Sequence, residues 1–264
     1  MKDLLKRLIQ FFGLEVIRAT TYKSLLKQVH QQNNKWLGDI DHVLNEELGD
    51  FEIAIQELTK DWFSQLGQDY LAYRLFGTSG YFVEFGATNG VELSNSYALE
   101  RLGWTGILAE PSRRWHKDLY SNRQTAVISK KCVWQTSGVE LDFIEATSGV
   151  LSTISDFAST DHHKREIERT YSVKTISLED LLIESEAPSF IEFLSIDTEG
   201  SEFTILESFN WNDFTFGLIA VEHNNTDARM KIFELLSSKG YHRVLTHLSK
   251  WDDWYVHDSL KRSS

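Results

Sequence analysis

Five short apolar runs, each separated from the next by longer and more polar segments, constrain the fold of this chain more than any other feature. The runs are rich in Val, Ile, Leu and Phe, and they are Tyr81–Phe85, Gly106–Glu110, Thr125–Ser129, Glu192–Asp197 and Gly217–Glu222. Strands that are apolar along nearly their whole length are covered on both faces, and the intervening segments read as helices. The pattern predicts an α/β fold with a mostly parallel sheet between helical layers.

Three further runs extend this prediction. "YHRVLT" and "DWYVH", near the end of the chain, are separated by a turn-like break, which predicts an antiparallel pair at the edge of the sheet. Leu141–Ala146 is predicted to be another short strand. The polar segment "STDHHKREIERTY", with its His162–His163 pair, is expected to be a mobile surface segment or a lid over the acceptor rather than a metal site.

The first sixty residues follow a different pattern and predict a separate helical appendage. Apolar residues there recur at steps of three and four, as in an amphipathic helix. We therefore divide the chain into an appendage, residues 1–60, and a main domain, residues 61–264. Residues 1–30 carry six bases and two acids. This segment is expected to pack on its neighbour or to form a homo-oligomer, and peripheral contact with an anionic membrane is the alternative.

Composition narrows the function classes. The net charge of −12 argues against a general nucleic-acid binder, because such proteins need basic surfaces. A single cysteine, Cys132, excludes an internal disulfide framework and gives no zinc cluster. The chain starts without the continuous apolar region of a signal peptide. A cytoplasmic location is the expectation.

The ends of the first two strands predict a cofactor site. The first strand ends at Glu84 and continues into "GATNG", in which Gly86 and Gly90 allow a ligand to approach the backbone. This spacing lacks the G-x-G-x-x-G of dinucleotide sites, so a purely structural turn is an open alternative. The second strand ends at Glu110, followed by Pro111, at about the distance from the first glycine at which such folds hold ribose hydroxyls.

The ends of two later strands supply a cluster of acids. Asp197 and Glu199 follow one strand, and Glu222 and His223 close the next. Carboxylates this close raise one another's pKa unless a cation or a proton lies between them. Asp197 and Glu222 are therefore candidate ligands of a divalent metal, and His223 or Glu199 is a candidate general base. Solvated surface acids are the simpler alternative.

Taken together, these motifs resemble the FkbM-type family of S-adenosylmethionine-dependent methyltransferases. The matching stretches are "SQLGQD", "FVEFGATNG", "LSNSY", "GWTGILAEPS", "LSIDTEGSEF", "VEHN" and "DDWYV". The resemblance spans about Trp62 to Val256 and does not reach the N-terminal segment. It implies a Rossmann-like class I methyltransferase sheet of seven strands, mostly parallel, with an antiparallel edge strand.

The resemblance also implies roles for individual residues. The cofactor would be S-adenosylmethionine, with Glu110 on its ribose and Cys132 and Val133 beside its adenine. The methionine end would lie against the turn after the first strand and the segment before it, with Asp197 close by; these residues are Gln68, Glu84, Gly86, Ala87, Asn89 and Gly90. Asn89 stands where close relatives often carry an acid. Pro111 belongs to the ribose-side turn.

The implied activity is O-methylation of a sugar, glycan or natural-product hydroxyl. Asp197, Glu199 and His223 are the candidate catalytic residues, and a divalent metal such as Mg²⁺ on Asp197 and Glu222 is the alternative way to activate the acceptor. Two other functions stay open. One is a nicotinamide-dependent oxidoreductase, against which the missing dinucleotide motif speaks, and the other is a non-catalytic binding protein that keeps the fold.

Overall fold

The computed structural model describes residues 62–158 and 164–260 of the 264-residue chain. The predicted helical appendage, its proposed membrane and subunit contacts, and the His162–His163 pair all lie outside the described residues and stay predictions. Within the described part, no helix is both long and apolar enough to cross a membrane.

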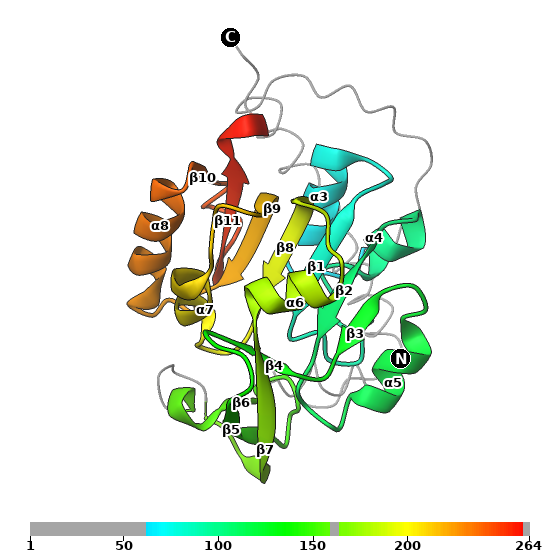
Figure 1. The fold of residues 1–264 in the computed structure, drawn as a ribbon, viewed down its shortest axis with the longest axis vertical. Coiled ribbons are helices and arrows are strands. Elements are labelled where there is room, and N and C mark those ends of the chain that lie inside the picture. Colours follow the sequence, from blue (N-terminus) through cyan, green and yellow to red (C-terminus); the bar gives the residue numbers. More distant parts are fainter. Residues whose placement is uncertain (1–61, 159–163, 261–264) are drawn as a thin grey trace, which may run out of the picture.

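A seven-stranded sheet forms the centre of the domain (Figure 1), in the order β10-β11-β9-β8-β1-β2-β3. The strands are β1 Tyr81–Phe85, β2 Thr105–Ala109, β3 Val127–Ser129, β8 Phe190–Ile196, β9 Thr215–Glu222, β10 Tyr241–Val244 and β11 Asp252–His257. β11 pairs antiparallel with β9 on one side and with β10 on the other, and the other pairs are parallel. The predicted sheet, including the late antiparallel pair, is confirmed.

Helices cover both faces of this sheet. They are α3 Gln68–Phe76, α4 Tyr97–Leu102 and α5 His116–Asn122 on one face, and α6 Leu178–Glu184, α7 Glu202–Ser208 and α8 Ala228–Ser238 on the other. Alternate residues of β1 face the two helical layers. Phe82 packs in the hydrophobic cluster on one side of the sheet, and Val83 and Phe85 pack in the cluster on the other side. This double burial explains why the strands are apolar throughout. Short 3-10 turns occur at Ser155–Phe157 and Asp258–Leu260.

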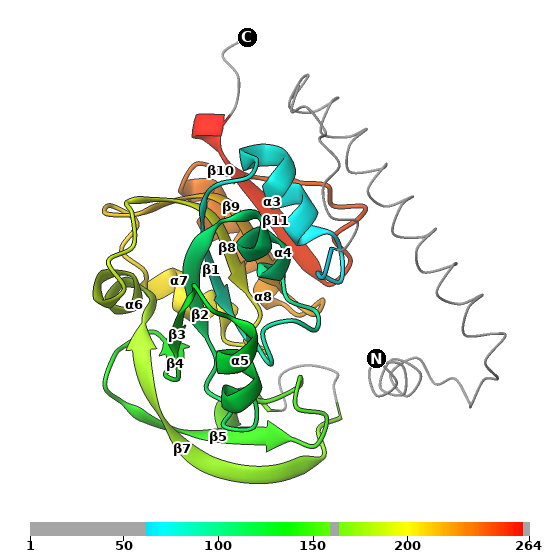
Figure 2. The same cartoon turned by 90° about the vertical axis from the view of Figure 1, so that its right-hand side faces the viewer.

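A second, smaller sheet is inserted between β3 and α6. Its strands are β4 Cys132–Trp134, β5 Glu140–Ala146, β6 Thr153–Ile154 and β7 Ile167–Ser177, in the order β4-β7-β5-β6. Figure 2 shows β5 and β7 lying side by side below the main sheet. The inserted sheet has a small core of its own around Phe143 and Val173.

The prediction for the segment before Tyr171 was wrong in part. We expected a mobile segment or lid, but residues 167–171 form the first half of β7, paired antiparallel with β5. The strand escapes sequence recognition because most of this half is solvent-exposed and carries the polar side chains of Glu168, Arg169 and Thr170. No apolar run marks a strand of this kind.

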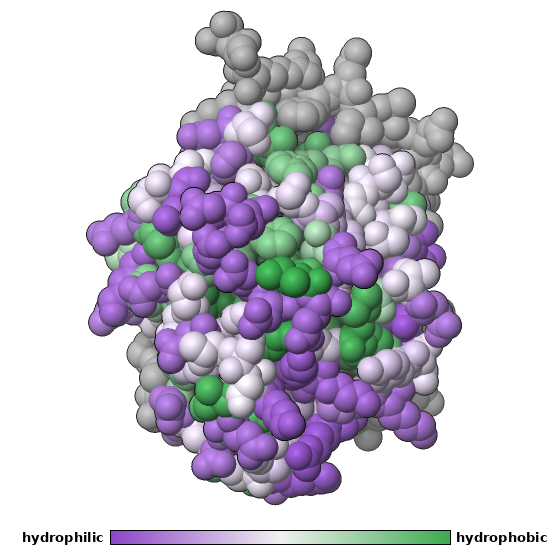
Figure 3. Space-filling model, in the orientation of Figure 1, coloured by the Kyte–Doolittle hydropathy of each residue, from purple (hydrophilic) through white to green (hydrophobic). Residues whose placement is uncertain are grey.

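The face of the molecule drawn in Figure 3 is mainly hydrophilic. On this face, polar and charged side chains cover most of the described surface, and apolar side chains form small patches near the middle. The apolar side chains of the two large clusters lie instead between the central sheet and its helices.

Candidate active site

A cavity of about 800 Å³ opens at the carboxyl ends of the central strands. This is where open α/β sheets bind ligands, and the volume lies within the range of small-molecule sites. The ends of β1, β2, β8 and β9 form one side, through residues such as Gly86, Glu110, Asp197 and Glu222. Residues of the inserted sheet, including β4, form the other side.

The turn after β1 lies tightly against the end of β8. Gly86 has a φ of +75°, and a Cβ at this position would come closer than 3.0 Å to the carbonyl oxygen of Asp197. Its N–H donates to the carbonyl of Ala109 at 3.0 Å. Gly86 and Ala87 line the cavity, so the turn presents backbone rather than side chain to a ligand.

Four of the residues predicted at the methionine end do not line the cavity: Gln68, Glu84, Asn89 and Gly90. The Glu84 carboxylate accepts hydrogen bonds from the hydroxyls of Ser94 and Ser96 and from the N–H of Asn95, which holds the loop before α4. Ser94, which belongs to this loop, lines the cavity. Glu84 thus acts on the cavity through the loop that it orders.

The other three residues, Asn89, Gly90 and Gln68, lie behind the residues that line the cavity. The side chain of Asn89 accepts from the N–H groups of Val91 and Glu92, each at 2.9 Å. Gly90 leaves room for α5, because a Cβ there would meet Leu119 and Arg123. Gln68 donates to Asp252 at 2.5 Å, next to the acid cluster.

Glu110, predicted to bind a ribose, is held in the cavity by two backbone hydrogen bonds. One carboxylate oxygen accepts from the N–H of Thr88 at 2.8 Å, and the other accepts from the N–H of Ser112 at 2.7 Å. Burial raises the pKa of Glu110 to about 7, and these two hydrogen bonds oppose the rise. Pro111 also lines the cavity. The carboxylate can still accept hydrogen bonds from a diol on its remaining lone pairs.

Cys132 and Val133, on β4, line the cavity beyond Glu110. The Cys132 thiol is free, and burial raises its pKa to about 12, so it is protonated and apolar at neutral pH. Together with Phe143 and Ile154 of the inserted sheet, these residues give this end of the cavity an apolar lining. A flat aromatic ring such as adenine suits such a surface.

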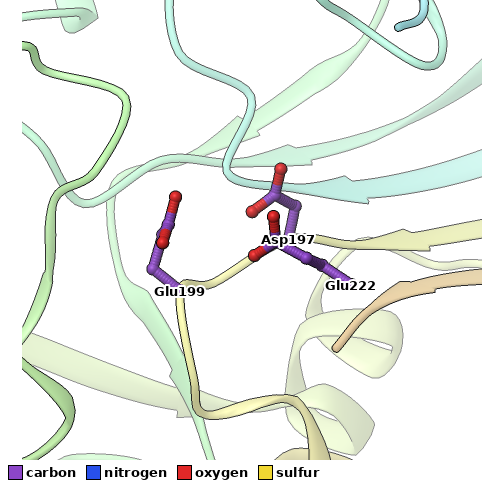
Figure 4. A group of neighbouring side chains, drawn as sticks. All are labelled: Asp197, Glu199 and Glu222. Atoms are coloured by element: carbon purple, nitrogen blue, oxygen red, sulfur yellow. The ribbon is translucent and has the colours of Figure 1, made fainter. Parts of the chain in front are cut away.

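Three carboxyl groups meet at the opposite end of the cavity. Asp197, Glu199 and Glu222 each place an oxygen so that all three oxygens lie within 4.8 Å of one another. Figure 4 shows the carboxyl groups of Asp197 and Glu222 side by side, with Glu199 facing them. The carboxyl groups of Asp197 and Glu222 lie close enough to share one proton. The group that holds this proton can donate it to the other.

Burial and neighbouring acids keep that proton in place near neutral pH. Burial, with the charges of Asp252 and Glu202, raises the pKa of Asp197 to about 7. Burial and the charge of Asp197 raise the pKa of Glu222 well above its ordinary value. One oxygen of Glu222 is buried without a hydrogen-bond partner. The pair therefore has the electrostatics of a proton acceptor poised near neutrality.

Glu199 links this end of the cavity to the inserted sheet. Its carboxylate forms a buried ion pair with Arg165 at 2.9 Å, and its carbonyl accepts from the hydroxyl of Thr153 at 3.0 Å. Its φ of +59° is unusual for a residue with a side chain. Arg165 was missed by the sequence analysis, because it lies in a polar segment far from the motifs that surround the strand ends.

His223 points away from the cavity. Its Nδ1 accepts from the N–H of Asn225 at 2.9 Å, and its Nε2 faces Asp253 at 3.7 Å. The two residues after it, Asn224 and Asn225, line the cavity in its place. The structure thus brings Asp197, Glu199 and Glu222 together and leaves His223 behind the wall. A catalytic role for His223 stays a prediction, and its side chain does not line the cavity.

Comparison with known proteins fits this geometry. The family described as "Methyltransferase FkbM domain" matches residues 84–251, which is more than half of the chain. The chain belongs to the FkbM methyltransferase family. The match includes the turn after β1, Glu110 and the acid cluster, and the sequence resemblance is confirmed. The domain is a methyltransferase, and the methyl donor of this family is S-adenosylmethionine.

Two solved structures are similar to this FkbM domain. One is the O-methyltransferase from Bacillus cereus in complex with SAH, at 13% identity over 84% of this chain and 89% of the other, with a TM-score of 0.41. The other is the fibrillarin/Nop5p complex, at 12% identity over 74% of this chain and 80% of the other, with a TM-score of 0.35. No curated protein matches the chain.

The acid cluster of the FkbM domain predicts a pH-dependent stability. A carboxyl with a raised folded-state pKa binds its proton more tightly when folded, so its contribution is present at low pH and is lost as the pH rises. For Asp197 the window runs from 3.8 to about 7. Between these limits we expect Asp197→Asn to flatten the pH dependence of the unfolding free energy by on the order of 2 kcal/mol.

Urea unfolding at a series of pH values measures this effect. Glu207→Gln makes the same kind of change at an exposed position on α7 and should leave the wild-type pH dependence unaltered. If the Asp197→Asn curve runs parallel to the wild-type curve throughout the window, the raised pKa is not a property of the folded domain.

Proposed function

We propose that this domain transfers a methyl group from S-adenosylmethionine to a hydroxyl oxygen of a small-molecule or glycan acceptor. The adjacent carboxyl groups of Asp197 and Glu222, beside the turn at Gly86, carry the proposal. A neutral hydroxyl is a poor nucleophile, and a carboxylate that accepts its proton near pH 7 removes that obstacle. Family membership fixes the methyl donor and leaves the acceptor atom open.

The described residues fit the donor. Gly86 and Ala87 offer a cradle of bare backbone, Glu110 offers carboxylate oxygens for a ribose diol, and Cys132 and Val133 offer an apolar surface. When bound, S-adenosylmethionine supplies a methyl group on a positively charged sulfur, which becomes a neutral thioether as the methyl passes to the acceptor oxygen.

Residues of the chain orient the acceptor and take up the proton of its hydroxyl group. The acceptor hydroxyl loses its proton to the unprotonated carboxylate of the Asp197–Glu222 pair as its oxygen bonds to the methyl carbon. Glu199, fixed by Arg165, narrows the same end of the cavity. Asn224 and Asn225 add amide groups that can hydrogen-bond other hydroxyls of the acceptor.

A divalent cation such as Mg²⁺ is the alternative occupant of the acid cluster. Carboxylate oxygens are hard ligands that suit it, but a proton shared by Asp197 and Glu222 and the ion pair of Glu199 already balance part of the charge. We favour the shared proton. Transfer assays after treatment with a chelator decide, because activity that returns only on adding Mg²⁺ would assign the cluster to the cation.

Calorimetric titration tests the donor site. Wild type should bind S-adenosylmethionine and not NAD, whereas the oxidoreductase alternative requires the reverse. Glu110→Gln should weaken S-adenosylmethionine binding about tenfold or more, because an amide nitrogen would face the N–H of Thr88 or Ser112. Glu207→Gln is the matched control. Wild-type-like affinity of Glu110→Gln would remove Glu110 from the donor site.

Turnover needs its own assay. Incubation with radiolabelled S-adenosylmethionine and a panel of sugars and polyols should give an acceptor labelled on oxygen. Donor binding without transfer to any acceptor would favour the non-catalytic alternative. The cytoplasmic location also stays a proposal, with which the free thiol of Cys132 is compatible.

A further inference from the structure

A second hollow, of about 580 Å³, lies next to the donor cavity. Pro111 lines both. The other lining residues come from the start of α5, from the turn between β3 and β4, and from the inserted sheet; they are Arg113, His116, Lys130, Glu140, Ser172, Val173 and Lys174. The hollow therefore brings together four separate segments of the chain, and four of its eight residues are basic types.

Three cations of this hollow have no carboxylate partner within the described part of the chain. Arg113 donates to the carbonyl of Ser172 at 3.2 Å and stacks 4.2 Å above the Tyr171 ring. Lys130 lies 4.8 Å from the centre of the Tyr120 ring. Among residues 62–158 and 164–260, no carboxylate forms an ion pair with Arg113, Lys130 or Lys174.

Two cations that are next in sequence to residues of the hollow form ion pairs. Lys131, next to Lys130 in sequence, forms an ion pair with Glu184 at 2.8 Å. Arg114, next to Arg113, forms one with Glu168 at 3.2 Å. Arg113 and Lys130 thus differ in pairing from their sequence neighbours, in a chain whose overall charge is negative.

The balance of charge in the hollow favours a dianion. Glu140 opposes the three cations and accepts a hydrogen bond from the Ser172 hydroxyl at 3.1 Å, which leaves an excess of two positive charges. The Nε2–H of His116 donates to the Glu110 carbonyl at 2.9 Å. Burial, with the nearby charges of Lys130 and Arg113, lowers the pKa of His116, so the ring adds no charge of its own at neutral pH.

We propose that this hollow is an anion site that binds a phosphate or diphosphate group. The guanidinium of Arg113 supplies a planar fork of donors suited to phosphate oxygens, and Lys130 and Lys174 supply point charges. The phosphate arrives either as a free anion or as part of a larger organic ligand. The site is independent of the acceptor chemistry proposed above, because its lining shares only Pro111 with that of the donor cavity.

Calorimetry on the full chain tests the site with three probes at constant ionic strength: inorganic phosphate, pyrophosphate and glucose 1-phosphate. Lys130→Ala and Lys174→Ala should each weaken binding about tenfold, since each removes a charge-assisted contact. Lys131→Ala, the matched control, should bind as wild type does. Both test positions are exposed, so folding should be unaffected.

The outcomes separate the alternatives. Glucose 1-phosphate binding at least as tightly as phosphate identifies a ligand-borne phosphate, and much weaker binding identifies a free anion; both support the site. Absence of binding by all three probes, or equal losses in Lys131→Ala and Lys174→Ala, overturns it. A parallel S-adenosylmethionine titration of each variant should be unchanged, so failure here leaves the proposed function untouched.

Discussion

Asp197→Asn is expected to lower kcat for methyl transfer by about 10²–10⁴-fold, the usual contribution of a general base. Asn has nearly the shape of Asp, but it cannot take up the acceptor's proton, and it leaves Glu222 without the partner that shares one. Binding of S-adenosylmethionine should be largely retained, because the turn at Gly86 and the carboxylate of Glu110 are untouched. Single-turnover assays with radiolabelled donor measure the rate, and calorimetry measures the affinity.

The pH profile gives this prediction a second readout. Since the pKa of Asp197 lies at about 7, the wild-type rate should rise with pH through neutrality and level off above it. Glu222→Gln should impair transfer as well, whereas Glu207→Gln should retain both rate and profile. Full activity in both Asp197→Asn and Glu222→Gln would move the acceptor site elsewhere in the cavity.

Gly86→Ala is expected to destabilise the domain by about 3 kcal/mol or more, since the new methyl group would overlap backbone that cannot move cheaply. The Asp197 carbonyl lies in its way, at the junction of β1 and β8 in the middle of the sheet. Relief of the clash requires the two strand ends to separate. The change should therefore also abolish binding of S-adenosylmethionine, as equilibrium urea unfolding and calorimetry would show.

Gly138→Ala separates the clash from the cost of backbone conformation. Gly138 has a φ of +81°, close to the +75° of Gly86, but nothing lies within 4 Å of its missing Cβ. Its replacement should cost about 1–2 kcal/mol, the usual strain of a left-handed residue with a side chain. Equal losses in the two variants would mean that the close approach to Asp197 has no energetic weight.

The central sheet could be predicted from sequence because each strand is buried on both faces. Val83 and Phe82 face opposite helical layers, so the run around them is apolar throughout and easily recognised. The strand ends follow at once, and with them Gly86, Glu110, Asp197 and Glu222, which the fold brings to one cavity. Parallel strands have their carboxyl ends at one edge, so this convergence follows from topology alone.

The sequence could not show which side chains face the cavity, nor how the inserted sheet folds. Whether His223 faces the cavity or Asp253 depends on one turn after β9, where Asn224 and Asn225 adopt positive φ values. Glu84 and Gly90 have the right positions in the motif, yet they support the wall from behind. Arg165 reaches Glu199 only because the strand after it, β7, folds back on β5, and the exposed half of β7 carries no apolar signal.

The inserted sheet forms one side of the cavity, and it folds around a core that is separate from that of the central sheet. The central sheet leads into Gly86 and Glu110, and the inserted sheet, which has its own small core around Phe143 and Val173, adds Cys132 and Val133. At the acid cluster the two are joined by Thr153 and Arg165 on Glu199. Substitutions around Thr153 and Arg165 can therefore reshape the acceptor end while Gly86 and Glu110 stay in place, which makes this part of the insertion the natural place for acceptor preference to diverge among descendants of one ancestral fold.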